Sequence, residues 1–270
     1  MTDRYAVIGN PIAHSKSPVI HAKFAEQTGQ DMAYAAILGP LDGFVDAIRQ
    51  FKAEGGRGVN VTVPFKQAAW QFATRLTERA RMAEAVNTLK FEEGATLGDN
   101  TDGAGLVRDI EHNLGCAIAG KKVLLMGAGG AARGVLLPLL EQKPLLLVVA
   151  NRTPDKARDL AARFASSGAV SGSDYASLAG QQFDLVINAT SASLSDALPP
   201  LPSGVFATGS LAYDMMYGKG LTPFLKFAQE QGAARLADGL GMLVEQAAES
   251  FFLWRGVRPD TKSVIDLLKQ

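Results

Sequence analysis

The chain has 270 residues, enough for one large or two medium domains. Lys plus Arg and Asp plus Glu both number 27, so no net charge favours nucleic acid or a membrane surface as a partner. The single cysteine, Cys116, cannot form an internal disulfide, which favours the cytoplasm, and we expect neither a secretion signal nor a membrane span.

Short apolar segments alternate with helical segments over the first third of the chain. The expected strands are Tyr5–Gly9, Met32–Leu38, Val59–Val63, Ala85–Phe91 and Ala95–Leu97. The expected helices are Pro18–Gly29, Leu41–Ala53, Lys66–Thr74, Glu78–Met82 and a segment from Asp102 to about Leu114. This alternation is typical of an α/β domain with a mainly parallel sheet.

The segment Val123–Gly134, VLLMGAGGAARG, indicates a buried strand, a glycine turn and the start of a helix. Gly127 allows a tight turn, Gly129 lets the backbone approach a phosphate, and Ala132 permits close packing of the helix on the strand. The free amides and positive dipole end of such a helix favour an anion. The pattern therefore predicts a site for the pyrophosphate of a dinucleotide.

A second apolar strand, Leu145–Ala150, ends at Asn151, Arg152 and Thr153. A site for NAD usually has an Asp or Glu here, which accepts from the ribose 2′-hydroxyl. Arg152 can instead pair with a 2′-phosphate and stack on the adenine. The alternative is that Arg152 is only a solvated residue at a strand end. We favour the first interpretation, which predicts NADP(H) as the cofactor.

The next segments predict further strands and a helix of the same nucleotide-binding domain, followed by a loop. Strands at Leu185–Asn188 and Leu211–Asp214, with a helix from Pro154 to about Phe164, indicate a Rossmann-type doubly wound sheet. The segment Ser191–Pro202 is rich in Ser, Ala and Pro and indicates a surface loop.

Two helices end the sequence, from Leu240 to about Trp254 and over Thr261–Lys269. They have no strands of their own, so we expect them to return to the N-terminal domain. The predicted fold is therefore a two-domain α/β protein, with a discontinuous domain of residues 1–103 and 240–270 and an inserted domain of residues 104–239.

Polar clusters follow the apolar strands of the first domain, where active sites of α/β sheets form. They are Asn10–Pro18 (NPIAHSKSP), Asn60–Lys66 (NVTVPFK), Asn87-Thr88 and Gly98–Gly103 (GDNTDG). Residues in these clusters can have a structural role or a functional one, and the spacing of the residues alone does not decide between the two.

In the first cluster, the hydroxyls of Ser15 and Ser17 suit a carboxylate, although Ser17 before Pro18 is also a common helix N-cap. Lys66 can be a solvated surface charge, and Asp102 can be the N-cap of the helix that follows it. We expect His14 and His21 to be structural rather than catalytic.

Seven segments, in order along the chain, resemble those of the shikimate dehydrogenases of bacterial aromatic biosynthesis. They are Asn10–Pro18, Asn60–Lys66, Gly98–Gly103, Gly127–Ala131, Asn188–Ser191, Tyr213–Tyr217 and Asp238–Met242. The resemblance implies the reversible, NADPH-dependent reduction of 3-dehydroshikimate to shikimate, without a metal. One departure is Ala192, where the family often has a glycine.

The resemblance also implies roles for individual residues. Lys66 and Asp102 would form the catalytic acid–base pair, and Ser15 and Ser17 would hold the substrate carboxylate. Further substrate contacts would come from Asn60, Thr62, Asn87, Tyr217 and Gln246. The cofactor would be contacted by Gly127, Ala128, Gly129, Gly130, Ala131, Asn151, Arg152, Thr153, Thr190, Met215, Gly239 and Met242.

Two rival interpretations follow from the same residues. A relative acting on quinate, or using NAD as well, would share most of the motifs, although Arg152 argues against an NAD-linked enzyme. A non-catalytic NADP-binding regulator is expected to lack Lys66 or Asp102, and both are present. The sequence leaves the oligomeric state open, a homodimer included.

Overall fold

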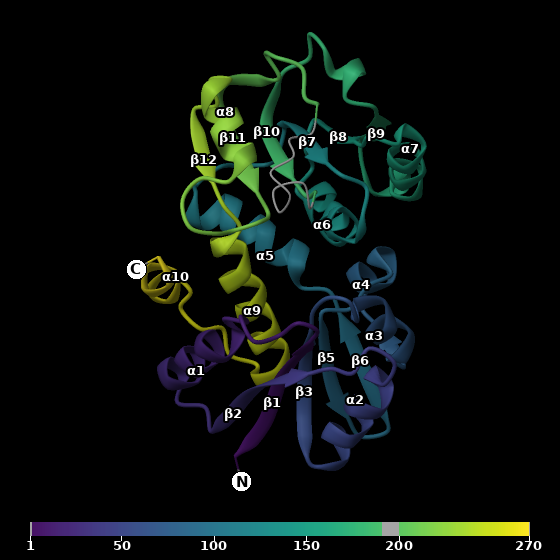
Figure 1. Cartoon of the computed structure of the whole chain (residues 1–270), viewed down its shortest axis with the longest axis vertical. Coiled ribbons are helices and arrows are strands. Elements are labelled where there is room, and N and C mark those ends of the chain that lie inside the picture. Colours follow the sequence, from purple (N-terminus) through teal and green to yellow (C-terminus); the bar gives the residue numbers. More distant parts are fainter. Residues whose placement is uncertain (1, 191–199, 270) are drawn as a thin grey trace. The chain divides into compact units, whose positions relative to one another are not determined.

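The computed structural model describes residues 2–190 and 200–269 and divides into two compact units (Figure 1). The first unit runs to Gly105 and resumes at Leu243, and the second is Leu106–Met242. Most of the predicted loop Ser191–Pro202, and with it Ala192, lies outside the described residues. Within the described part, no helix has both the length and the apolar character that crossing a membrane requires.

The first unit is built on a six-stranded sheet with strand order β2-β1-β3-β5-β6-β4. The strands are β1 (Asp3–Gly9), β2 (Met32–Leu38), β3 (Gly56–Val61), β4 (Arg75–Leu76), β5 (Thr88–Glu92) and β6 (Ala95–Asp99). Only β5 is antiparallel to its neighbours, which confirms the prediction of a mainly parallel sheet.

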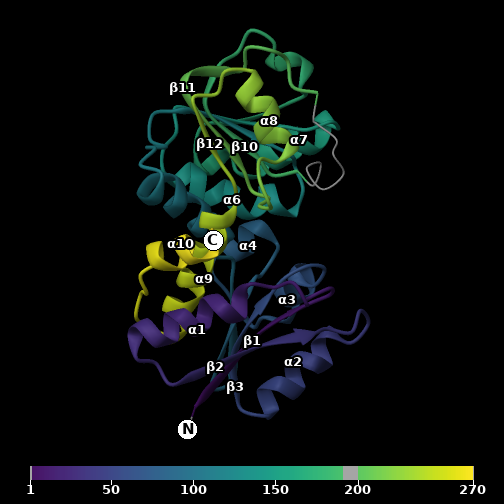
Figure 2. The ribbon, with the colours of Figure 1, turned by 60° about the vertical axis from the view of Figure 1, so that its left-hand side comes forward.

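Helices cover both faces of this sheet because successive strand residues point to opposite sides. The helices are α1 (Ser17–Thr28), α2 (Phe44–Ala53), α3 (Lys66–Phe72), α4 (Glu78–Ala83), α9 (Leu240–Arg255) and α10 (Lys262–Leu268). Ala6 and Ile8 of β1 join the core under α2 and α3, whereas Tyr5 contacts Trp254 of α9. A separate apolar cluster joins α1, α9 and α10. The three helices lie together in Figure 2.

The second unit has six parallel strands in the order β12-β11-β10-β7-β8-β9. They are β7 (Lys122–Met126), β8 (Leu146–Ala150), β9 (Val170–Ser173), β10 (Phe183–Asn188), β11 (Phe206–Asp214) and β12 (Arg235–Ala237). The chain winds outward from β7 in one direction and then from β10 in the other. This order confirms the predicted doubly wound, Rossmann-type sheet.

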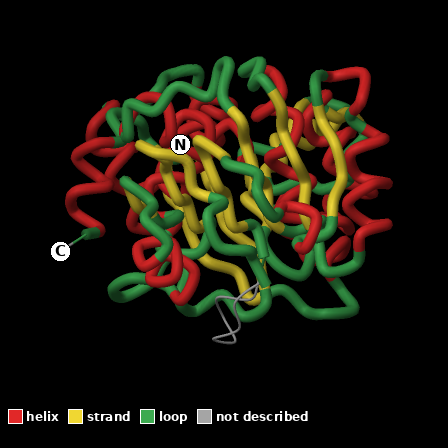
Figure 3. The backbone as a smooth tube through the Cα atoms, turned by 90° about the horizontal axis from the view of Figure 1, so that it is seen from above, coloured by secondary structure: helices red, strands yellow, loops and turns green. Residues whose placement is uncertain are grey.

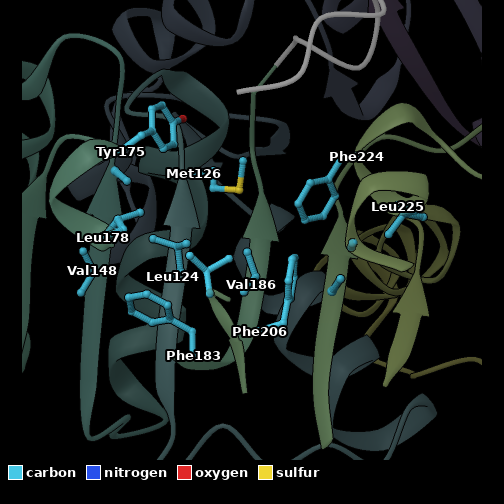
Figure 4. Close-up of a cluster of buried hydrophobic side chains, with 14 residues drawn as sticks. Leu124, Met126, Val148, Tyr175, Leu178, Phe183, Val186, Phe206, Phe224 and Leu225 are labelled. Atoms are coloured by element: carbon cyan, nitrogen blue, oxygen red, sulfur yellow. The ribbon is translucent and has the colours of Figure 1, made fainter. Parts of the chain in front are cut away.

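The second unit contains the helices α6 (Gly130–Glu141), α7 (Pro154–Arg163) and α8 (Pro223–Glu230). Helices flank the strands in the view of Figure 3. Leu124, Val186 and Phe206 come from three of the strands and point into one apolar core (Figure 4). Phe224 and Leu225 of α8 close the same core. Fully buried strands of this kind explain the continuous apolar runs in the sequence.

The helix predicted from Asp102 to about Leu114 is present, but its second half is π-helical rather than α-helical. The α-helix α5 ends at Arg108, and Asp109–Asn113 forms a π-helical turn, η1. Asp109 is buried and accepts hydrogen bonds from Tyr213 and Asn113, so tertiary contacts favour the wider turn. The short strands β4, β9 and β12 and the helix α8 had no sequence prediction.

Candidate active site

Strand polarity brings the polar clusters of the first unit to one edge of its sheet. β1, β3 and β6 run in the same direction, so the segments after their carboxyl ends lie at that edge. β5 runs the other way and therefore begins there, with Thr88 paired to Asn60 on one side and to Asp99 on the other. The four clusters recognised in the sequence thus lie at a common edge.

Lys66 and Asp102 form an ion pair, with 2.6 Å between Nζ and Oδ2. Lys66 begins α3 just after the proline that follows β3, and Asp102 begins α5. Their side chains are 32% and 15% exposed, so the pair is partly shielded but accessible. Lys66 is therefore not a freely solvated charge. Asp102 Oδ2 accepts from Lys66 and Oδ1 from Asn87, so side chains bind both carboxylate oxygens. This does not support the interpretation of Asp102 as a helix N-cap.

The amides of Asn87 and Gln246 lie beside this pair. Asn87 Nδ2 donates to Asp102 Oδ1 at 2.8 Å and to Gln246 Oε1 at 3.3 Å. Gln246, on α9, fixes its own amide by donating Nε2 to the Leu243 carbonyl at 2.8 Å. The structure therefore brings four of the predicted site residues together around one carboxylate.

Asn60 lies next in the same hydrogen-bonded group. Its Oδ1 accepts from the Tyr34 hydroxyl at 2.7 Å, and its Nδ2 donates to the Asn87 carbonyl at 3.2 Å. Burial raises the pKa of Tyr34 well above its usual range, while a hydrogen bond with Ser17 acts in the opposite direction. Tyr34 therefore stays protonated and links the Ser17 region to Asn60.

Ser15 and Ser17 are half-buried in the loop that leads from β1 into α1. The Ser17 amide donates to Ser15 Oγ at 3.3 Å. Lys16 occupies the N-cap position of α1 and makes no side-chain capping bond, so the interpretation of Ser17 as the N-cap is wrong. Thr62, just past β3, is half-buried, and its amide donates to the Ile8 carbonyl at 3.0 Å.

The glycine turn of the second unit has the form expected around a pyrophosphate. Gly127 follows β7 with φ +102°, a conformation that favours glycine. Among residues 2–190 and 200–269, a Cβ placed on Gly129 or Gly130 would meet no neighbouring segment within 4 Å, so these residues leave the backbone there open to a ligand. The helix α6 begins at Gly130, and no side chain of the described part of the chain caps it, which leaves amides for an anion. Ala128 and Ala131 belong to the same turn.

Asn151, Arg152 and Thr153 follow β8, the strand beside β7, at the same carboxyl edge. Asn151 Nδ2 donates to the Thr153 carbonyl at 3.0 Å, which shapes the turn. Arg152 and Thr153 are exposed, and no carboxylate stands in the triplet. These residues fit a cofactor that carries a 2′-phosphate.

Thr190 and Met215 follow β10 and β11 at that edge and are both held by Asn188. Thr190 Oγ1 donates to Asn188 Oδ1 at 2.7 Å, and the Met215 amide donates to the Asn188 carbonyl at 3.0 Å. Further along the same edge, the Gly239 amide donates to the Met216 carbonyl at 3.0 Å.

Met242 and Tyr217 complete the predicted residues of the second unit. Met242 is buried, and its amide is hydrogen-bonded to the Tyr213 hydroxyl. Tyr217 is 38% exposed, and partial burial raises the pKa of its phenol. Tyr217 is therefore protonated at neutral pH and presents a hydroxyl at the surface of this unit.

Sequence reasoning missed several hydroxyls that hold the first-unit site together. Thr88 and Thr101 stood inside recognised clusters but received no role, and Tyr34 and Ser250 received no attention. Ser250 had a weak signal, because it lies four residues after Gln246 and so on the same face of the helix.

Three family models match the chain. The substrate binding domain of shikimate dehydrogenase matches residues 7–89, the shikimate/quinate 5-dehydrogenase model matches residues 109–195, and the C-terminal domain of shikimate 5′-dehydrogenase matches residues 239–269. Together they span both units.

Individual proteins are similar over nearly the full chain. The shikimate dehydrogenase (NADP(+)) of Nitrosospira multiformis is 68% identical, over 100% of this chain and 98% of its own length. The crystal structure of an Ael1 enzyme from Pseudomonas putida is 56% identical with a TM-score of 0.95, covering 98% of each chain. The shikimate 5-dehydrogenase of Thermus thermophilus, in complex with NADP(H) and shikimate, is 33% identical with a TM-score of 0.87, covering 99% of this chain and 98% of that one.

Proposed function

The chain belongs to the family of NADP(+)-dependent shikimate dehydrogenases, and we propose that it catalyses their reaction with Lys66 and Asp102 at the reacting oxygen. The reaction is the reversible reduction of 3-dehydroshikimate to shikimate, a step of the shikimate pathway. The observation that carries the proposal is the Lys66–Asp102 pair, 2.6 Å apart and partly exposed among polar side chains.

Lys66 supplies and removes the proton of the reaction. When bound, NADPH supplies the hydride that the carbonyl carbon receives. The Lys66 ammonium stabilises the charge that develops on the oxygen and gives it a proton, and in the reverse direction Lys66 takes that proton back. Asp102 accepts a hydrogen bond from the ammonium at 2.6 Å and so holds it at this oxygen.

The substrate is held by the polar groups at the edge of the first-unit sheet. Ser15 and Ser17 donate hydroxyl hydrogens to its carboxylate. Its ring hydroxyls are bound by the side chains of Asn60, Thr62, Asn87 and Gln246. Tyr217 adds a phenolic hydroxyl to the substrate contacts. Neutral donors suit this task because they bind a carboxylate or hydroxyl without placing a second positive charge beside Asp102.

The second unit binds NADP(H). The turn Gly127–Ala131 receives the pyrophosphate, and Asn151, Arg152 and Thr153 hold the 2′-phosphate. The remaining cofactor contacts are Thr190, Met215, Gly239 and Met242. Two observations support this assignment: the described residues leave space over Gly129 and Gly130, and the 151–153 triplet has no carboxylate.

A steady-state assay tests the function directly. The purified protein is expected to reduce NADP⁺ with shikimate at a kcat/KM far above that with quinate, and above that with NAD⁺ as cofactor. A higher kcat/KM for quinate than for shikimate would show that the protein is a quinate dehydrogenase of the same family. No turnover of either acid would contradict the proposal. We also propose that the enzyme works in the cytoplasm, in line with its single cysteine, which cell fractionation tests.

A further inference from the structure

Two buried hydroxyls, those of Thr88 and Ser250, lie behind the substrate-binding amides of the first unit. Both residues are 0% exposed, so neither has surface to offer a ligand. Thr88 begins β5 and Ser250 lies on α9, yet their oxygens are 2.8 Å apart. The proposed function assigns them no role, although Thr88 stands beside Asn87 in a cluster that the sequence singled out.

The orientation of the Asn87 amide is determined by its neighbours. Asn87 Oδ1 accepts from the Thr101 backbone N–H at 2.9 Å, a group that can only donate. Thr88 Oγ1 donates to the same oxygen at 2.9 Å. The Asn87 nitrogen therefore faces Asp102, a carboxylate that can only accept when ionised. A flipped amide would set donor against donor and acceptor against acceptor.

The same two hydroxyls also orient Asn60. Asn60 Nδ2 donates to Thr88 Oγ1 at 3.1 Å and to Ser250 Oγ at 3.0 Å. Ser250 Oγ in turn donates to the Gln246 carbonyl at 3.0 Å, which leaves its lone pairs for Asn60. With Tyr34 donating to Oδ1, Asn60 is fixed at both ends of its amide.

We propose that Thr88 and Ser250 are positioning residues of the reaction, which fix the amides of Asn60 and Asn87 and, through Asn87, the carboxylate of Asp102. The inference rests on the proposed function, because it assumes that these amides and this carboxylate act on shikimate. Removing either hydroxyl leaves the fold's apolar contacts in place but takes a hydrogen-bond partner from these buried amides, which loosens their positions. Buried networks of this kind are sensitive to a single missing member.

Substitutions at Thr88 separate the hydroxyl from the shape of the side chain. Thr88→Val keeps the shape and removes the hydroxyl, whereas Thr88→Ser keeps the hydroxyl and removes a methyl group. We expect Thr88→Val to lower kcat/KM for shikimate by about tenfold or more, the usual size of a lost buried hydrogen bond. Thr88→Ser should restore most of that loss, and KM for NADP⁺ should change little in either variant.

Ser250→Ala has a matched control in Ser210→Ala. Ser210 is also a buried serine, on β11, and its hydroxyl has no hydrogen-bond partner among residues 2–190 and 200–269. Ser250→Ala should lower kcat/KM for shikimate by about fivefold or more, whereas Ser210→Ala should leave it unchanged. If Thr88→Val does not fold, this comparison decides the question alone.

The outcomes keep the two proposals apart. Equal kcat/KM in Thr88→Val and Thr88→Ser, or in Ser250→Ala and Ser210→Ala, would overturn the positioning role while the wild-type activity stands. A lower melting temperature without a change in kcat/KM would also overturn it, since that is what a purely structural role predicts. A wild-type protein that does not oxidise shikimate would overturn the proposed function, and this inference with it.

Discussion

Tyr213 donates its phenolic hydrogen to Asp109 Oδ2 at 2.6 Å, and both side chains are buried in the second unit. The Met242 amide is hydrogen-bonded to the same phenol. A Cβ at Gly241 would lie 2.0 Å from Asp109 Oδ1, so only glycine allows the chain to pass this close. The pair therefore holds the segment from Gly241 to Met242 against the π-helical turn at Asp109.

Tyr213→Phe should destabilise the protein by about 1–3 kcal/mol, because it removes the donor from a buried carboxylate. Urea unfolding measures this loss. Tyr175→Phe is the control, since Tyr175 is a buried tyrosine of the same unit that packs among apolar side chains. A loss in Tyr213→Phe no larger than in the control would show that the bond to Asp109 contributes little.

His21 should make the stability of the protein depend on pH in the acid range. Complete burial lowers the pKa of its ring to about 3, and the ring stacks on Tyr34 at 4.2 Å. Unfolded histidine titrates at about 6.5, so below that pH the unfolded state binds a proton that the folded state does not. Stability should fall as pH decreases from 6.5 towards 3, by up to about 1.4 kcal/mol per pH unit from this residue.

Urea unfolding of the wild type and of His21→Phe at a series of pH values tests this. Phenylalanine keeps an aromatic ring in the stack but cannot take up a proton. The acid slope of the free energy of unfolding should therefore be smaller in His21→Phe. His14→Phe is the control because His14 is exposed, and a slope equally reduced in both variants would contradict the assignment to His21.

Lys66→Met should lower kcat by about 10²- to 10⁴-fold, the usual contribution of acid–base catalysis, with little change in KM for shikimate. Methionine keeps much of the apolar stem and removes the ammonium from Asp102. Steady-state kinetics in both directions measure the effect. Lys23→Met, at an exposed lysine paired with Glu26, should leave kcat unchanged. A large rise in KM at unchanged kcat would instead make Lys66 a binding residue.

Arg152→Ala should weaken NADP(H) much more than NAD(H), because only NADP(H) carries the 2′-phosphate that the guanidinium pairs with. Titration of both reduced cofactors, followed by nicotinamide fluorescence, gives the two dissociation constants. Arg158→Ala removes another exposed arginine, on α7, and should affect neither. Equal losses for the two cofactors in Arg152→Ala would exclude a specific contact with the phosphate.

The parts of the fold that local sequence determines could be predicted. The turn at Gly127 depends on the residues next to it, and the sequence placed it correctly. The strand predicted to run to Val63, before Pro64, ends two residues earlier, at Val61. The π-helical turn at Asp109 could not be predicted, because it depends on Tyr213, a contact distant in sequence. Similarly, β4 and β12 are too short to leave a periodic pattern.

The candidate site divides in the same way. Lys66, Asn87 and Asp102 stand in recognisable motifs, and the structure brings them into contact. Ser250 could not be recognised, because a serine in an apolar helix gains its partners only when α9 meets β3 and β5. The roles given to Ser15, Tyr217 and Arg152 in binding shikimate and NADP(H) stay predictions.

The helices α9 and α10 complete the core beneath α1, with side chains such as Phe251 and Val264 against Phe24. On the ribosome, every residue of the second unit is therefore made before the first unit receives the segments that fill this core. Until then, the sheet that carries β1 and β3 has one face without its full apolar cover. The inserted unit is free to fold first, so the order of folding during synthesis can reverse the order in which the two units begin along the chain.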